Sequence, residues 1–149
     1  MDIHPAIRHA PDPEHPGWFT WDMAGPDRFN GAIGKLLVRA DAPGRARCRM
    51  FPDKTHSNLG DVVHGGAILT FIDMALFAGG RLAGANVIRA VTLDLNTQFL
   101  SPGRLDVPLD AEVELLRETG RLVFLSGKVV QEEEAIASFS GILRKVRRA

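Results

Sequence analysis

A carboxylate within an apolar run, and the glycine turn before it, are the residues of this chain best suited to chemistry. The turn is His64-Gly65-Gly66, and the run that follows to residue 79 is apolar except for Thr70 and Asp73. A segment that is apolar on every side is usually buried on every side, so Asp73 is expected inside the protein. An ionised carboxylate is costly to bury without partners. Asp73 is therefore expected either to have polar partners or to take part in a reaction.

A helix that begins near Gly65 would present free backbone N–H groups to an oxyanion. The first N–H groups of a helix lack partners, and glycine lets a substrate approach closely. Asp73 follows eight residues later, which is roughly 12 Å along a helix. One carbonyl cannot lie about 3 Å from both groups. If both act on one substrate, they come from different subunits, and a two-fold dimer with antiparallel neighbouring helices would contain two equivalent sites.

A purely structural interpretation of the same residues stays open. Gly65 and Gly66 would then form a tight turn, and Asp73 would be a buried hydrogen-bonding residue. A single histidine beside a turn, such as His64, is more often structural than catalytic. His56 and His64 do not have the helical spacing of a metal-ligand pair, so no metal site is predicted.

Composition indicates a soluble globular protein of one compact domain. The 149 residues are 45% hydrophobic and 24% charged, and 18 basic residues balance 18 acidic ones. No overall field favours nucleic acid or an anionic membrane. Cys48 is the only cysteine, which excludes an internal disulfide and suits a reducing compartment; we expect it to be packed rather than reactive. Without a signal pattern or an apolar run long enough for a bilayer, the predicted location is cytoplasmic.

The chain divides into a proline-rich arm, residues 1–27, and one folded domain, residues 28–149. The arm holds five of the nine prolines, which disfavours regular structure. Its segment from Trp18 to Met23 is too apolar for a free tail. We expect that segment to lie against the body or a neighbouring subunit, either as plain packing or as the lining of a ligand site.

Patterning within the domain predicts two strands, one long helix and four further strands. A hairpin is expected first, and the helix should run from Gly65 to the Gly79-Gly80 pair. One long apolar helix beside an antiparallel sheet is best buried when the sheet wraps around it, which is an α+β architecture. The predicted strands are Lys35–Ala40, Arg45–Phe51, Val91–Phe99, Val107–Leu116, Leu122–Val130 and Ala135–Val146.

Several of these segments together resemble a known family. Residues 58–66 (Asn-Leu-Gly-Asp-Val-Val-His-Gly-Gly), Asp73, residues 92–96 and residues 99–102 are similar to the hotdog-fold acyl-CoA thioesterases of the phenylacetate-pathway (PaaI-like) type. The resemblance covers roughly Asn30 to Val146. It implies the hotdog fold and hydrolysis of acyl-CoA to free acid and CoA. It also implies no cofactor beyond the CoA of the substrate, and a homodimer or a dimer of dimers.

The resemblance also assigns roles to individual residues. Asp73 matches the catalytic carboxylate, which activates water or attacks the thioester directly. Gly65 matches the residue whose N–H polarises the thioester carbonyl from the other subunit, with Asn58 and His64 assisting there. Thr92 falls where relatives have a serine or threonine that orients the water.

The sequence identifies the residues that contact the substrate less specifically than the catalytic residues. Gly66 and the basic residues Arg89 and Arg104 are expected to contact the substrate. The wider set of candidates for the CoA phosphates also includes Arg81, Lys128, Arg144 and Lys145. The sequence leaves both an aromatic and an aliphatic acyl group open, and the pocket for either would be lined by residues among Phe71, Met74, Leu76, Phe77 and the Trp18–Met23 segment. A non-hydrolytic acyl-CoA-binding protein remains the alternative, while the histidine and carboxylate motifs of hotdog hydratases are not found.

Overall fold

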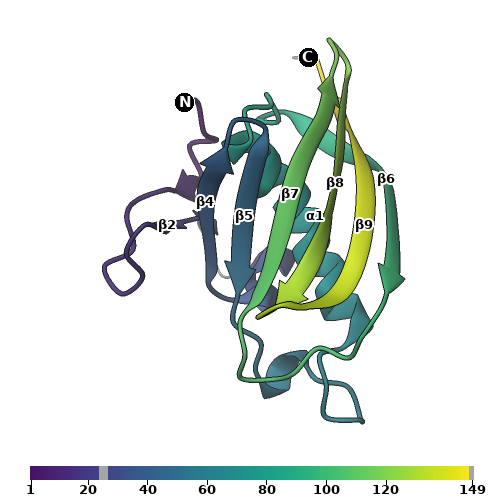
Figure 1. Cartoon of the computed structure of the whole chain (residues 1–149). Helices are drawn as coiled ribbons and strands as arrows, with labels where there is room; N and C mark the ends of the chain where they lie inside the picture. The colour runs from purple at the N-terminus through teal and green to yellow at the C-terminus, as the bar shows by residue number, and fades with distance from the viewer. Residues whose placement is uncertain (24–26, 148–149) are drawn as a thin grey trace.

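One antiparallel sheet curls around a single long helix, α1 (Gly65–Leu82) (Figure 1). The computed structural model describes residues 1–23 and 27–147; residues 24–26, part of the predicted arm, and 148–149 lie outside that description. The seven strands are ordered β2-β4-β5-β7-β8-β9-β6, so β2 and β6 form the two edges. This arrangement confirms the predicted α+β architecture of a sheet wrapped around one helix.

The long strands form where the alternation of apolar residues predicts them. In β5, Ala46, Cys48 and Met50 face the core, while the arginines between them face outward. Cys48 is fully buried and unbonded, and its burial raises the pKa of its thiol. The strands are β4 (Leu36–Ala42), β5 (Arg45–Met50), β6 (Ala90–Phe99), β7 (Leu109–Glu118), β8 (Leu122–Gln131) and β9 (Glu134–Lys145); the short elements are β1 (Ile7–Arg8), β2 (Phe19–Thr20), β3 (Asp22–Met23), η1 (Phe29–Ile33) and η2 (Lys54–His56).

The glycine pair of α1 does not end the helix, which continues to Leu82. Both glycines face the sheet. A Cβ on Gly79 would be 2.7 Å from Val113 Cγ2, and a Cβ on Gly80 would be 3.5 Å from Leu125 Cδ2. The predicted helix end was wrong because these glycines allow close packing of helix on sheet instead of a C-terminal cap.

Alanine substitutions at these two glycines are expected to differ in stability. Both gain the same helix propensity, but only Gly79→Ala forces a methyl group into Val113. Overpacking of this kind costs about 1–3 kcal/mol. The free energy of unfolding, measured by urea denaturation, should therefore be higher for Gly80→Ala than for Gly79→Ala by about that amount. Equal stabilities would contradict the close approach at Gly79.

By length and composition, α1 would also fit a membrane span, with a mean hydropathy of 1.3. The expectation that no apolar run is long enough for a bilayer was therefore wrong. Half of this span is buried inside the protein, and α1 packs mainly against β4, β5 and β7. This packing is that of a core helix, and a core helix can be as long and as apolar as a membrane span.

The N-terminal segment is bound to the sheet through its two tryptophans. Trp18 and Trp21 are 5% and 8% exposed, so the apolar part of the predicted arm does lie against the body, although Met23 is exposed. Two guanidinium groups lie over the Trp18 ring, that of Arg39 at 4.6 Å and that of Arg49 at 4.4 Å from the ring centroid. The strand β2 pairs with β4. The predicted boundary between arm and domain at residue 27 stays a prediction.

Attachment of this segment is expected to depend on pH. The hydrogen bond from Lys35 lowers the pKa of the buried Asp12 carboxyl from 3.8 to about 2. Because the folded-state pKa is depressed, Asp12 stabilises the fold above about pH 4 and loses that contribution as the pH falls toward 2. Both tryptophans of the chain lie in this segment, so their fluorescence should shift in that range. The fluorescence shift should be much weaker in Asp12→Asn. Helical circular dichroism is the control for global unfolding. Identical pH profiles of fluorescence in the two proteins would contradict the role of Asp12.

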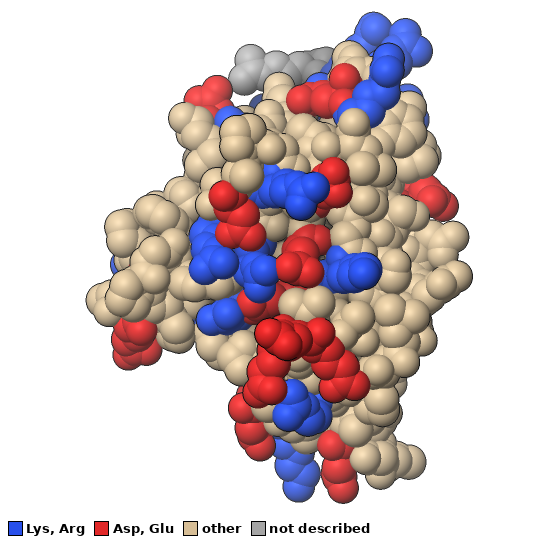
Figure 2. Space-filling view, viewed as in Figure 1, with Lys and Arg blue, Asp and Glu red and all other residues tan. Residues whose placement is uncertain are grey.

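Paired charges cover the outer face of β5 and β7. Figure 2 shows basic and acidic groups interleaved there. Asp110 is 5% exposed and accepts a two-pronged hydrogen bond from Arg49, at 2.6 and 2.8 Å. Arg47 bridges Asp110 and Glu112. Carboxylates therefore neutralise Arg47 and Arg49.

Candidate active site

Asp73 is partly exposed at the rim of a cavity, and Thr92 is its hydrogen-bond partner. Thr92 Oγ1 donates to Asp73 Oδ1 at 2.6 Å. The expectation that Asp73 is buried was wrong for the single chain. The apolar run correctly indicates a core helix, but Asp73 lies on the side of α1 that faces the edge strand β6 and the cavity. Among the described residues no group bonds its second carboxylate oxygen, Oδ2, which is thus available to a ligand.

A β-bulge turns Thr92 toward the helix. Strict alternation along β6 would put Thr92 on the opposite face from Leu95. The register shifts between Thr92 and Asp94, so that Thr92 pairs with Leu143 and Leu95 pairs with Gly141. Directly paired residues share a face, and Leu143 is fully buried. The extra residue at the bulge re-aims the Thr92 hydroxyl at Asp73, as bulges near active sites often do.

The start of α1 leaves one backbone donor free. His64 caps the helix, and its Nδ1 accepts a hydrogen bond from the Gly66 N–H at 2.8 Å. The N–H groups of Ala67 and Ile68 donate to the His64 carbonyl. Within residues 1–23 and 27–147, no group accepts the Gly65 N–H. Gly65 therefore offers a donor at the positive end of the helix dipole, while the Gly66 N–H is already engaged.

Asn58 shapes the loop in front of this helix end. Its Oδ1 accepts hydrogen bonds from the N–H groups of Gly60 at 2.8 Å and Val62 at 3.4 Å. Asp61, in the same turn, has a φ of 57°, a left-handed conformation that aspartate tolerates. Asn58 and His64 line one shallow hollow at the surface. The loop thus gathers Asn58, His64 and the free donor of Gly65 at one end of α1.

The two groups of residues form separate half-sites within one chain. Gly65 and Asp73 are separated by two helical turns, roughly 12 Å. The intervening side of the protein is apolar and exposed along the edge strand β6, where the Phe99 ring lies over Gly65. The exposed apolar side chains there, 38–55% accessible, are Leu69, Val91, Leu93, Phe99 and Leu100.

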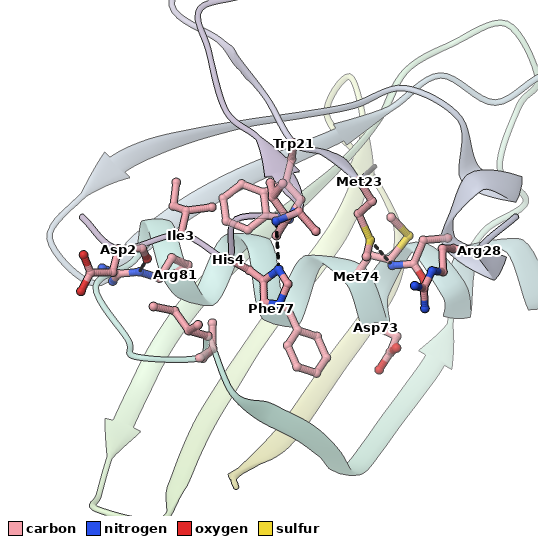
Figure 3. Close-up of a pocket in the computed structure, with 15 residues that line it drawn as sticks. Asp2, Ile3, His4, Trp21, Met23, Arg28, Asp73, Met74, Phe77 and Arg81 are labelled. Carbon is pink, nitrogen blue, oxygen red and sulfur yellow. Dashed lines mark hydrogen bonds between the residues drawn. The ribbon is translucent and has the colours of Figure 1, made fainter. Parts of the chain in front are cut away.

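The cavity beside Asp73 has a volume of about 570 Å³. Met74 and Phe77 of α1 line it, together with Trp21 and Met23 of the N-terminal segment (Figure 3). Two other candidates for the acyl pocket, Phe71 and Leu76, are fully buried in the core instead. The sequence did not predict the other lining residues, among them Ile3, Ile7, Arg28 and Ile88. Two isoleucines among prolines were the only signal for the wall near the N-terminus.

The two arginines expected near the CoA phosphates lie at opposite ends of β9. The Arg89 carbonyl accepts a hydrogen bond from Val146, just after β9. The backbone of Arg104 pairs with the Gln131 side chain, just before β9, and its guanidinium is 3.5 Å from Glu132. Both arginine side chains are exposed. Arg89 is three residues before Thr92 of the Asp73 half-site. Arg104 is next to Gly103, whose carbonyl accepts a hydrogen bond from Val63, just before the Gly65 half-site.

Comparison with known proteins identifies relatives over the domain. The model of the thioesterase superfamily matches residues 60–138. Human acyl-coenzyme A thioesterase 13 is 29% identical over 102 residues, which cover 66% of this chain and 69% of that protein.

Solved structures extend the likeness to the three-dimensional fold. A mutant of the phenylacetic acid degradation protein PaaI from Thermus thermophilus superposes with a TM-score of 0.67 at 25% identity, covering 80% of this chain and all of that one. A hypothetical thioesterase from Streptococcus pneumoniae, solved with coenzyme A, has a TM-score of 0.69 at 16% identity, covering 80% and 92%. The fold is the hotdog fold, as the resemblance implied.

Proposed function

This chain belongs to the thioesterase superfamily, and from that premise we propose that it hydrolyses acyl-CoA thioesters to the free acid and CoA. The observation that carries the proposal is the Asp73 carboxylate, bonded by Thr92 at the rim of an apolar cavity. A thioester is a reactive acyl donor whose thiolate leaves readily at neutral pH. One base and one oxyanion donor therefore suffice. We propose that no metal or cofactor is needed besides the CoA of the substrate.

Asp73 supplies the base or the nucleophile of this reaction. Thr92 holds Oδ1, so Oδ2 is the oxygen that takes a proton from water or attacks the thioester carbonyl. In the first route, the oxygen of water bonds to the carbonyl carbon while the proton passes to Asp73. The C–S bond then breaks, and the CoA thiolate leaves with the electron pair and is protonated from Asp73 or solvent. In the second route, Oδ2 bonds to the carbonyl carbon, the C–S bond breaks and the CoA thiolate leaves with the electron pair. Water then hydrolyses the acyl-aspartate anhydride to the free acid and regenerates Asp73.

Gly65 stabilises the oxyanion, and it does so in the site of the other subunit. The distance of roughly 12 Å along α1 prevents one chain from supplying both groups to one carbonyl. A second copy placed across the exposed apolar edge strand β6 would bring each Gly65 to the partner's Asp73. A homodimer, alone or within a tetramer, is therefore part of the proposal.

The remaining residues assist at the same composite site. Asn58 and His64 hold the loop and the helix cap that orient the Gly65 N–H. His64 also offers Nε2 to the substrate, since its Nδ1 is engaged. Arg89 of one subunit and Arg104 of the other are proposed to meet the CoA phosphates. A cytoplasmic location suits a CoA-dependent enzyme with one buried cysteine.

Purified protein with a panel of acyl-CoAs and a thiol-detecting reagent tests the proposal. We expect release of free CoA well above the uncatalysed rate for at least one acyl group. Size measurement by light scattering should give a dimer or a larger even assembly. Tight binding of an acyl-CoA whose thioester stays intact for hours would overturn hydrolysis and favour the non-hydrolytic alternative.

A further inference from the structure

The outer wall of the cavity beside Asp73 comes from the N-terminal segment, outside the residues that match the superfamily model. On one side the cavity is lined by side chains of α1, including Phe77. On the other side it is lined by Ile3, Ile7 and Trp21. Its volume of about 570 Å³ is typical of small-molecule sites. The first residues of the chain thus build part of a site whose reactive group lies in the hotdog domain.

The cavity runs along α1 from Asp73, with Arg28 on the same side, to Arg81, which lies beside Asp2 (Figure 3). Asp73, Phe77 and Arg81 are spaced four residues apart, so they share one face of the helix. Figure 3 shows Asp73 and Arg81 toward opposite ends of the lining set, with Phe77 between them. The distance between the two ends is roughly 12 Å along the helix axis. The side chains between them are mostly apolar.

Arg81 connects the beginning of the chain to the helix at the far end of the cavity. Its Nε donates to the Asp2 carbonyl at 2.7 Å, and its Nη1 donates to the Ala85 carbonyl at 3.1 Å. These bonds hold residue 2 across the end of the cavity that lies away from Asp73. An occupant that enters beside Asp73 therefore meets this contact after two turns of α1.

The wall itself is fixed by backbone pairing. Strand β1 pairs with β3, which places Ile7 opposite Met23. The Trp21 N–H donates to the Leu36 carbonyl of β4 at 3.1 Å, and the Trp21 ring is 8% exposed within the core. Ile3 and Ile7 pack against the same core. These residues are therefore positioned to limit the space beside Phe77.

We propose that the N-terminal segment is the specificity wall of the acyl pocket, and that it selects a straight apolar acyl group of medium length. This inference rests on the proposed function. An extended chain advances about 1.3 Å per carbon, given C–C bonds of about 1.5 Å. With the thioester carbonyl at Asp73, about nine carbons fit within the roughly 12 Å between the two ends, so a chain of eight carbons stops just before the Asp2–Arg81 contact. A longer chain must displace that contact, and a polar chain loses its hydration against the apolar lining.

Activity across chain lengths tests the wall. We expect kcat/KM to be highest for octanoyl-CoA and at least about tenfold lower for palmitoyl-CoA. The Ile3→Ala/Ile7→Ala variant, which widens the cavity, should raise the palmitoyl-to-octanoyl ratio about tenfold. Ile7→Phe, which fills it, should lower octanoyl-CoA turnover and spare acetyl-CoA. Arg8→Ala is the matched control, because Arg8 follows Ile7 in β1 but is exposed and does not line the cavity.

Ratios between substrates separate this inference from the proposed function. An unchanged ratio in both the widened and the filled variant would overturn the wall while leaving hydrolysis intact. If no acyl-CoA is turned over, hydrolysis fails, and binding of octanoate tests the pocket alone. In a Trp18→Phe background the remaining fluorescence reports Trp21, which lines the cavity. A saturable change in this fluorescence on addition of octanoate, weaker in Ile7→Phe, would support the pocket. No change in fluorescence would overturn the pocket.

Discussion

Replacing Asp73 by asparagine is expected to lower kcat by about 10²- to 10⁴-fold, the usual contribution of a positioned base. Asparagine keeps the shape of the side chain, and its Oδ1 still accepts the hydrogen bond from Thr92. The loss therefore reports on the missing carboxylate rather than on a disturbed site. Release of CoA under saturating acyl-CoA measures the effect.

Two controls sharpen this result. KM should change little, since the CoA contacts are elsewhere, and the thermal midpoint should stay close to that of the original protein because Asp73 is partly exposed. Thr92→Val should cost about tenfold, in line with a hydrogen bond to a charged group, while Thr92→Ser retains the hydroxyl. Full activity in Asp73→Asn would remove Asp73 from the chemistry.

Loss of the Gly65 N–H is expected to lower kcat by about 10²- to 10³-fold, as for other single oxyanion donors. Gly65→Pro removes this donor alone. Proline is well tolerated at the first helical position, and His64 already has the extended backbone, φ −60° and ψ 134°, that a residue before proline prefers. Gly65→Ala is the matched control, since it keeps the N–H and its Cβ would lie 3.4 Å from the Phe99 ring.

Mixed dimers then show which subunit supplies the donor. Chains carrying Asp73→Asn and chains carrying Gly65→Pro are given different tags, produced together and purified through both tags. If each site takes Gly65 from one chain and Asp73 from the other, every mixed dimer has one intact site and recovers about half of the original activity. If both groups came from one chain, each site would carry one defect. Activity that stays at the level of the parent variants would refute the composite site.

Local patterns in the sequence were sufficient for the order of the elements and for the central helix. Alternation marked β4 to β9 within a few residues, because a strand that buries one face must repeat every second residue. Apolar residues on every side marked α1 as a core helix. They did not reveal that Asp73 lies at a cavity rim, since burial depends on which strand covers each face of the helix.

Long-range packing decided the features that local patterns predicted wrongly or missed. Gly79 and Gly80 have the composition of a helix end, but Val113 of a distant strand requires the small size of Gly79, and the helix continues past both. Strict alternation along β6 would place Thr92 on the opposite face from Leu95, and the bulge against β9 puts both on the same face. Ile3 and Ile7 carry no recognisable motif, and they line a cavity because β1 pairs with β3.

By itself, the sequence determined which reactive groups are available and how far apart one helix holds two of them. A glycine at a helix start and a carboxylate eight residues later cannot meet at one carbonyl, because the rise of the helix is the same in every protein. Only the tertiary structure decided which hydroxyl contacts Asp73, which backbone donor stays free and which segment encloses the cavity. Those outcomes depend on strand register and on contacts between residues far apart in the chain, and neither is encoded in a local repeat.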